Sequence, residues 1–299
     1  MKAQKKSGWL LRIVLLIILY VPIWVSGTLV ITHLDPDFPS EPGLVDTGMG
    51  VFILSIINTL LIVGLIVSSN LRGFRLALLL GIAYYGVFTF LTQIETWYFL
   101  GELNVSKELL FELLLMGLPV PFLFIPLAVF LCGRWKAQKN IISNDSLNLH
   151  MSELILKIFI LAVVYVLIYW LAGYFIAWQN PQLREFYGSP GEIVPFWKHT
   201  FSTMINDPGL FILQIMRGSL FTLIAFSIIR NSNVSRWITA LLIGLFLAAP
   251  HFGHILSNPL MPLASVRLSH MIETASSTFV YGVIIVMVLY RKNNAVKDL

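Results

Sequence analysis

The chain has 299 residues, of which 57% are hydrophobic and 12% charged, with a formal net charge of +5 and a mean hydropathy of +0.82. Soluble domains are about half apolar and about one quarter charged, so this composition excludes a water-soluble fold. The basic residues lie in short segments between apolar runs rather than in one cluster, which excludes a nucleic-acid partner and favours the lipid bilayer.

A membrane-spanning helix needs about 20 predominantly apolar residues, and eight segments meet this requirement. The sequence therefore predicts an all-α, polytopic integral membrane protein. In chain order, we expect the spans at 9–32, 48–69, 76–100, 109–133, 154–178, 208–229, 237–256 and 269–290. The first follows a basic start, as a signal peptide does, but lacks a small-residue cleavage site after a short apolar core. We expect it to be retained.

Lys and Arg concentrate on one side of these spans, and that side is normally cytoplasmic. With the N-terminus inside, the inner segments hold 13 of these residues and the outer loops hold four. This pattern predicts eight helices with both termini in the cytoplasm, in the plasma (inner) membrane of a bacterial cell.

Loop lengths suggest that a single transmembrane domain is divided into two halves. Long outer loops at 33–47 and 179–207 occupy corresponding places. We expect parallel four-helix halves at 9–133 and 154–290, joined by a cytoplasmic loop at 134–153.

Ionisable side chains inside a membrane are costly, so each needs a partner or a function. Those within the predicted spans, away from the inner ends, are Glu95, Glu112, Arg217, His251, His254, His270 and Glu273. With the predicted orientation, all except Arg217 belong to the outer half, and Arg217 lies near the midplane. The sequence thus predicts a polar pocket open to the extracytoplasmic side, to which Asn258 also belongs.

Arg217 presents five N–H donors and stays charged at ordinary pH. We expect Glu95, Glu112 or Glu273 to accept from it, with Gln214 on the same helix face. The alternative is a buried ion pair that only locks helix packing.

The histidines allow a metal interpretation, because His251 and His254 share a helix face, as do His270 and Glu273. Imidazoles with a carboxylate suit zinc or another divalent metal, with water completing a catalytic site. The alternative is neutral histidines hydrogen-bonded to glutamates or lying at the membrane interface. Pro250 is expected to bend its helix beside His251. The single cysteine, Cys132, excludes an intrachain disulfide.

Two short motifs resemble those of the intramembrane CAAX-protease and bacteriocin-processing family. They are Arg217-Gly218 and His254-Ile-Leu-Ser-Asn258. Ile212 and Leu213 stand where that family has a pair of glutamates, so its general base is missing here. The resemblance is confined to residues 212–258 and does not assign the chain to the family.

Three functions remain open. In a hydrolase acting on a lipid or peptide, the histidines would hold a metal or act as base, Glu273 or Glu95 would move the proton, and Arg217 would hold an anion. These histidines are His251, His254 and His270. A transporter, or the membrane subunit of one, is the second, and the predicted halves favour it. A scaffold or accessory subunit is the third. A carrier needs polar lining on both sides of the midplane, and the inner half of the sequence offers little.

Overall fold

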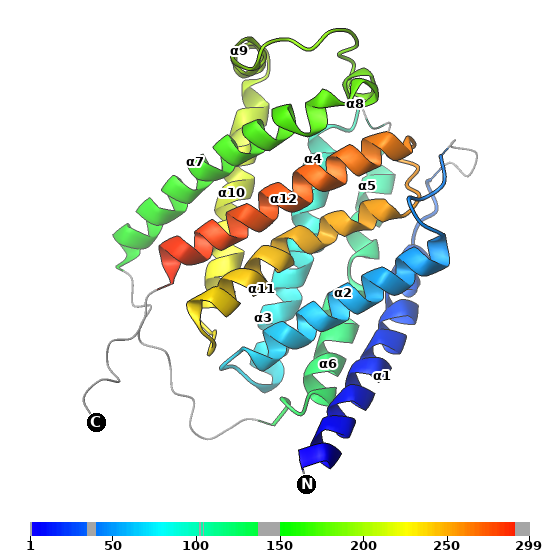
Figure 1. Ribbon diagram of the computed structural model, residues 1–299, viewed down its shortest axis with the longest axis vertical. Coiled ribbons are helices and arrows are strands. Elements are labelled where there is room, and N and C mark those ends of the chain that lie inside the picture. Colours follow the sequence, from blue (N-terminus) through cyan, green and yellow to red (C-terminus); the bar gives the residue numbers. More distant parts are fainter. Residues whose placement is uncertain (1, 35–39, 102, 104, 137–149, 291–299) are drawn as a thin grey trace.

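The computed structural model describes residues 2–34, 40–101, 103, 105–136 and 150–290, with side chains from residue 8 onward, and the described part of the chain is helical. By length and composition, eight of its helices can cross a membrane, which confirms the predicted number of spans. The long helices lie side by side, and the short α8 and α9 cover one end of the bundle (Figure 1). We call this the α9 end.

The α-helical segments of the eight spans are α1 (Lys2–Thr28), α2 (Thr47–Val67), α3 (Gly73–Tyr85), α4 (Leu91–Tyr98), α5 (Lys107–Met116), α6 (Ile125–Leu131), α7 (Met151–Phe175), α10 (Pro208–Ile229), α11 (Arg236–Ala248) and α12 (Ala264–Leu289). Two short helices, α8 (Pro181–Phe186) and α9 (Phe196–Asn206), lie in the loop that was predicted without helices. The first helix begins at Lys2 rather than at residue 9, and it ends at Thr28 rather than at residue 32.

Four spans depart from regular α-helix, and among them the fifth ends in a 3-10 helix, Ala177–Gln179. The third contains a π-helical turn, Gly86–Phe90, between α3 and α4, and the fourth contains another, Val120–Phe124, beside Pro119 and Pro121. The seventh ends in a 3-10 helix, Ala249–Ile255, that includes Pro250, as expected from a residue that cannot donate to the α-helical ladder. The π-turns lie near the middle of the third and fourth spans, and the 3-10 segments lie at the α9 end of the fifth and seventh. Such π-turns often accompany functional sites.

Side-chain caps define several helix starts at the α9 end. Asp46 accepts from backbone N–H groups at the start of α2, Ser106 does so for α5, and Asp207 does so for α10. Such caps satisfy N–H groups that have no partner within the helix. The chain therefore enters each span at a fixed residue.

Small residues allow the closest helix contacts. A Cβ atom on Gly282 of α12 would lie 2.8 Å from the Cα atom of Gly244 in α11, and one on Gly218 of α10 would lie 2.7 Å from the Tyr165 Cβ atom in α7. Close approach of this kind is typical of membrane helices. Accordingly α12 packs against α11, α7 and α10, and Figure 1 shows it between α7 and α11.

The half of the bundle away from α9 is filled with apolar side chains. Fully buried examples are Ile62, Ile66, Leu76, Val129 and Ile285. Most of the polar residues predicted for the site lie in the other half.

Two arginines shape the loops at the α9 end. Arg267 is fully buried and donates to the carbonyl oxygens of Met261 at 2.9 Å and Pro262 at 2.8 Å. Arg184 donates to the carbonyl oxygens of Trp178 at 2.7 Å and Gly191 at 3.0 Å. Backbone carbonyl oxygens thus accept hydrogen bonds from both guanidinium groups and stabilise their charge.

Candidate functional site

A cavity of about 1350 Å³ opens among the helices at the α9 end. Ligand sites for small molecules are typically about 300–1,000 Å³, so this cavity has room for a larger occupant such as a lipid or a peptide segment. Its walls come from α1, α4, α5, α7, α9, α12 and the 3-10 helix that follows α11.

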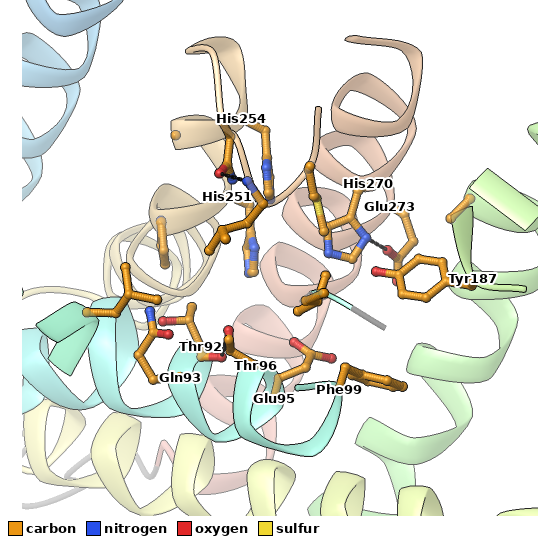
Figure 2. Close-up of a pocket in the computed structure, with 18 of the residues that line it drawn as sticks. Thr92, Gln93, Glu95, Thr96, Phe99, Tyr187, His251, His254, His270 and Glu273 are labelled. Carbon is orange, nitrogen blue, oxygen red and sulfur yellow. Dashed lines mark hydrogen bonds and ion pairs between the residues drawn. The ribbon is translucent and has the colours of Figure 1, made fainter. Parts of the chain in front are cut away.

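Most of the predicted site residues line this cavity. They are Glu95, His251, His254, Asn258, His270 and Glu273. Figure 2 shows Glu95 on α4, opposite the histidines and Glu273. The rule that ionisable residues in a membrane face the bundle interior thus placed these residues together.

His270 and Glu273 form a dyad on one wall. The His270 Nδ1 atom lies 3.2 Å from Glu273 Oε2, and the Glu273 side chain is only 5% exposed. A carboxylate can only accept, so the contact favours the tautomer with the proton on Nδ1 and leaves Nε2 as a base. The ring of His254 stands across that of His270, with centroids 5.2 Å apart.

Arg217 lies behind the opposite wall rather than on the cavity surface. Its Nη1 atom donates to Glu95 Oε1 at 2.6 Å and to Gln214 Oε1 at 3.0 Å. The Arg217 side chain is 3% exposed and that of Glu95 is 21% exposed. Glu95 therefore reaches from a buried cation to the cavity, and Arg217 holds it in place.

A second, very small cavity of about 10 Å³ connects these groups. Glu95, Arg217, His251 and Glu273 all line it. Within the described part of the chain, Arg217 Nε and His251 Nε2 have no hydrogen-bond partner although both are buried. The Arg217–Glu95 pair and the histidine wall thus share one polar neighbourhood.

Glu112 differs from the expectation. It accepts from the backbone N–H groups of Thr32 at 2.9 Å and His33 at 3.0 Å, and its Oε1 atom lies 2.7 Å from His33 Nδ1. These groups follow the end of α1 and offer a carboxylate several donors at once. Glu112 therefore holds that loop against α5, whereas Arg217 forms its ion pair with Glu95.

The metal interpretation gains no support from the geometry. Among the described residues, no group of three or more His, Cys, Asp or Glu side chains is arranged to hold a metal ion. The His254 ring meets that of His270 edge-on, and Glu273 contacts the Nδ1 atom of His270. We therefore derive no step through zinc or another divalent metal.

Several cavity residues escaped the sequence analysis. Thr92, Gln93 and Thr96 share the α4 wall with Glu95 and point toward the histidines in Figure 2. The stretch 92–96 has four polar residues in five, which is unusual inside a span and was a usable signal. On α9, Lys198, His199, Ser202 and Asn206 also line the cavity.

The floor of the cavity is a short hydrogen-bonded chain. Tyr20 and Tyr84 hydroxyl oxygens are 3.1 Å apart, and the Tyr84 hydroxyl donates to Asn58 Oδ1 at 3.3 Å. Asn58 is eleven residues from the start of α2 at Thr47, which is about 16 Å of helix. The cavity therefore reaches roughly the middle of the second span.

Comparison with protein-family models, with curated proteins and with solved structures found no match for this chain. Membership of a multi-pass membrane protein class follows from its eight candidate spans. What it does has to be argued from the cavity itself.

Proposed function

We propose that this chain is a membrane-embedded hydrolase that acts on an ester or amide bond of an amphipathic substrate, a lipid or a peptide. The observation that carries the proposal is the His270–Glu273 dyad, 3.2 Å apart, on the wall of a large cavity. A histidine oriented by a carboxylate is a common general base.

The lining of the cavity suits an amphipathic molecule. Apolar side chains of α1 and α5, among them Trp24, Leu109 and Met116, line one region. The polar side chains of α4, α12 and the 3-10 helix line another. A substrate could place an acyl chain or apolar side chain in the first region and its scissile bond near His270.

In the proposed reaction, His270 Nε2 accepts a proton from water while the hydroxide attacks the substrate carbonyl carbon. Glu273 stabilises the imidazolium that forms, as a carboxylate does when it orients a catalytic histidine. The C–O or C–N bond then breaks, and His270 returns the proton to the leaving group. Gln93, on the facing wall, is the candidate donor to the oxyanion of the tetrahedral intermediate.

We propose that the α9 end faces the extracytoplasmic side. The inner segments carry most of the Lys and Arg, and cytoplasmic loops are rich in both. Two of the outer basic residues, Arg184 and Arg267, are buried and hydrogen-bonded to carbonyls. Because both arginines have a structural role, their presence on this side does not count against the proposed orientation.

The position of the cavity in one half of the bundle favours an enzyme over a transporter. Beyond Asn58 and Tyr84, the described core is mostly apolar. A carrier would need a polar route through that half, whereas an enzyme can work from one leaflet.

The test uses purified protein with a panel of fluorogenic long-chain acyl esters and fluorescence-quenched apolar peptides. We expect turnover of one substrate class to fall about 10²-fold or more in His270→Ala and in Glu273→Gln, because general-base catalysis contributes that much. Ser276→Ala, on the exposed face of the same helix, is the matched control and should retain activity. Equal turnover in wild type and His270→Ala, or none in any protein, would contradict the proposal and favour an accessory role.

A further inference from the structure

Three arginines meet at the end of the bundle opposite α9. Arg12 is in α1, Arg72 immediately precedes α3, and Arg134 follows α6. A Cβ atom on Gly133 would lie 3.7 Å from Arg12 Nη1, and Arg134 Nη2 donates to the Val67 carbonyl oxygen at 2.9 Å. Burial, and then the charge of Arg72, lower the pKa of Arg134. We call these three side chains the arginine cluster.

The backbone holds two members of the cluster at a fixed separation. The Gly73 N–H group donates to the Arg134 carbonyl oxygen at 2.8 Å. Gly73 has a φ of +62°, and a Cβ atom there would lie 2.8 Å from the Trp135 carbonyl oxygen. Only glycine fits this junction. Arg72 immediately precedes Gly73, and Arg134 supplies the carbonyl oxygen that Gly73 binds. The two like-charged side chains are therefore kept near each other.

Within the described residues, no carboxylate pairs with any member of the arginine cluster, since the four ion pairs there involve other groups. The first turn of α3 also lacks a side-chain cap, so its partial positive charge adds to the cluster. Guanidinium groups favour phosphate, which offers several acceptor oxygens. The cluster therefore fits a phosphate-bearing ligand.

Exposed apolar side chains lie within four residues of each member of the cluster in the sequence. Leu11 is 70% exposed, Phe74 is 69% exposed and Phe130 is 60% exposed. In a protein with eight candidate spans, exposed apolar side chains of this kind face lipid. Arg12 also lies over the ring of Trp9, at 5.9 Å from its centroid, as residues at the membrane interface do.

We propose that the arginine cluster binds the phosphate-bearing headgroup of an anionic phospholipid, whose acyl chains lie along Leu11, Phe74 and Phe130. This site is separate from the cavity and does not depend on the proposed hydrolase. Basic pockets between membrane helices are known to select such headgroups.

Native mass spectrometry of the purified full chain tests this proposal with phosphatidylglycerol, phosphatidylcholine and inorganic phosphate as probes. We expect phosphatidylglycerol to remain bound in preference to phosphatidylcholine. Each of Arg12→Gln and Arg72→Gln should weaken that binding about fivefold. Arg230→Gln removes an exposed arginine from the same end but outside the cluster, and it should leave binding unchanged.

Arg12 is exposed, so Arg12→Gln is expected to fold even if Arg72→Gln does not, and circular dichroism checks this. Equal loss in Arg230→Gln would show only a general attraction to basic residues and would overturn the proposal. Equal binding of phosphatidylcholine, or binding of inorganic phosphate that displaces phosphatidylglycerol at equal concentration, would overturn it as well.

Discussion

At the scale of single residues, the site depends on how buried charges are paired. Arg217 gives its Nη1 protons to both Glu95 and Gln214, and Glu95 carries the negative charge to the cavity. Removing one member of a buried ion pair leaves an uncompensated charge, whereas removing both is often close to neutral. The pair should therefore behave as a unit.

We predict that Arg217→Met and Glu95→Gln each lower the free energy of unfolding, by about 3 kcal/mol for the buried arginine. The double variant should be more stable than the sum of the single effects indicates, with a coupling of about 1–3 kcal/mol. Unfolding in detergent, followed by loss of helical circular dichroism, measures all four proteins. Additive effects would show that the two side chains do not interact.

Much of the site could be predicted from single residues, and the exceptions have physical causes. Glu95, His251, His270 and Glu273 line one cavity, as expected because charged or imidazole side chains inside spans turn away from lipid. Glu112 was grouped with them, but the backbone N–H groups that hold it follow a helix end whose position the sequence did not reveal. The roles proposed for these residues in the reaction remain predictions.

At the scale of elements, α9 is the part of the chain that the sequence analysis missed. Its exposed side chains Trp197, Phe201 and Ile205 recur every four residues, as on one face of a helix. The intervening Lys198 and Ser202 face the cavity. In Figure 1, α9 is seen end-on and so runs across the long helices. Eleven residues with many polar groups are too short for a span, so a search for spans overlooks them.

His199 joins α9 to the end of the fifth span, with its ring 5.6 Å from that of Tyr174 in α7 and 5.0 Å from that of Trp178 just after α7. Burial lowers the pKa of His199 below its ordinary value of 6.5. The docked helix therefore favours the neutral ring, and its docking is fully stable above pH 6.5 and weakens as the pH falls below that value.

We predict that amide hydrogen exchange in Phe196–Asn206, corrected for its intrinsic pH dependence, is faster at pH 5 than at pH 7.5. His199→Phe keeps the aromatic contact without a titratable group, so its protection should not change with pH. If the wild type and His199→Phe respond alike, another group is responsible.

Helix boundaries show why the elements were predicted unevenly. The range 208–229 matches α10 from end to end because Asp207 caps it and Pro208 begins it. The 3-10 segment Ala249–Ile255 was expected to be a bent helix, and only the tertiary structure shows how far the bend extends. The π-turn at Val120–Phe124 contains Pro121, whereas the one at Gly86–Phe90 has no such local signature.

At the scale of the whole molecule, the two halves of the bundle differ in polarity. One half of the bundle is closed by apolar side chains, and the other contains a polar cavity. Composition predicted the number of spans because lipid imposes length and hydropathy on each helix separately. The shape of the cavity depends on contacts between distant helices, so it could not be predicted in the same way. The proposed division into two parallel halves stays a prediction, which superposition of 9–133 on 154–290 would test.

Cysteine labelling tests the asymmetry directly, because Cys132 can be removed to give a background without thiols. Burial raises the pKa of Cys132 to about 11, so its side chain stays a thiol and reacts slowly. Its removal is therefore expected to change the labelling little. Single cysteines are then placed at Thr96 in the cavity, at fully buried Thr222, and at Arg230 on the opposite end.

Intact cells are treated with a membrane-impermeant maleimide. We predict that Thr96→Cys is labelled from outside and that Thr222→Cys is not labelled. Arg230→Cys should be labelled only after the membrane is permeabilised. A Thr96→Cys protein that is protected from outside, or that reacts only after permeabilisation, would contradict a polar cavity open to the extracytoplasmic side.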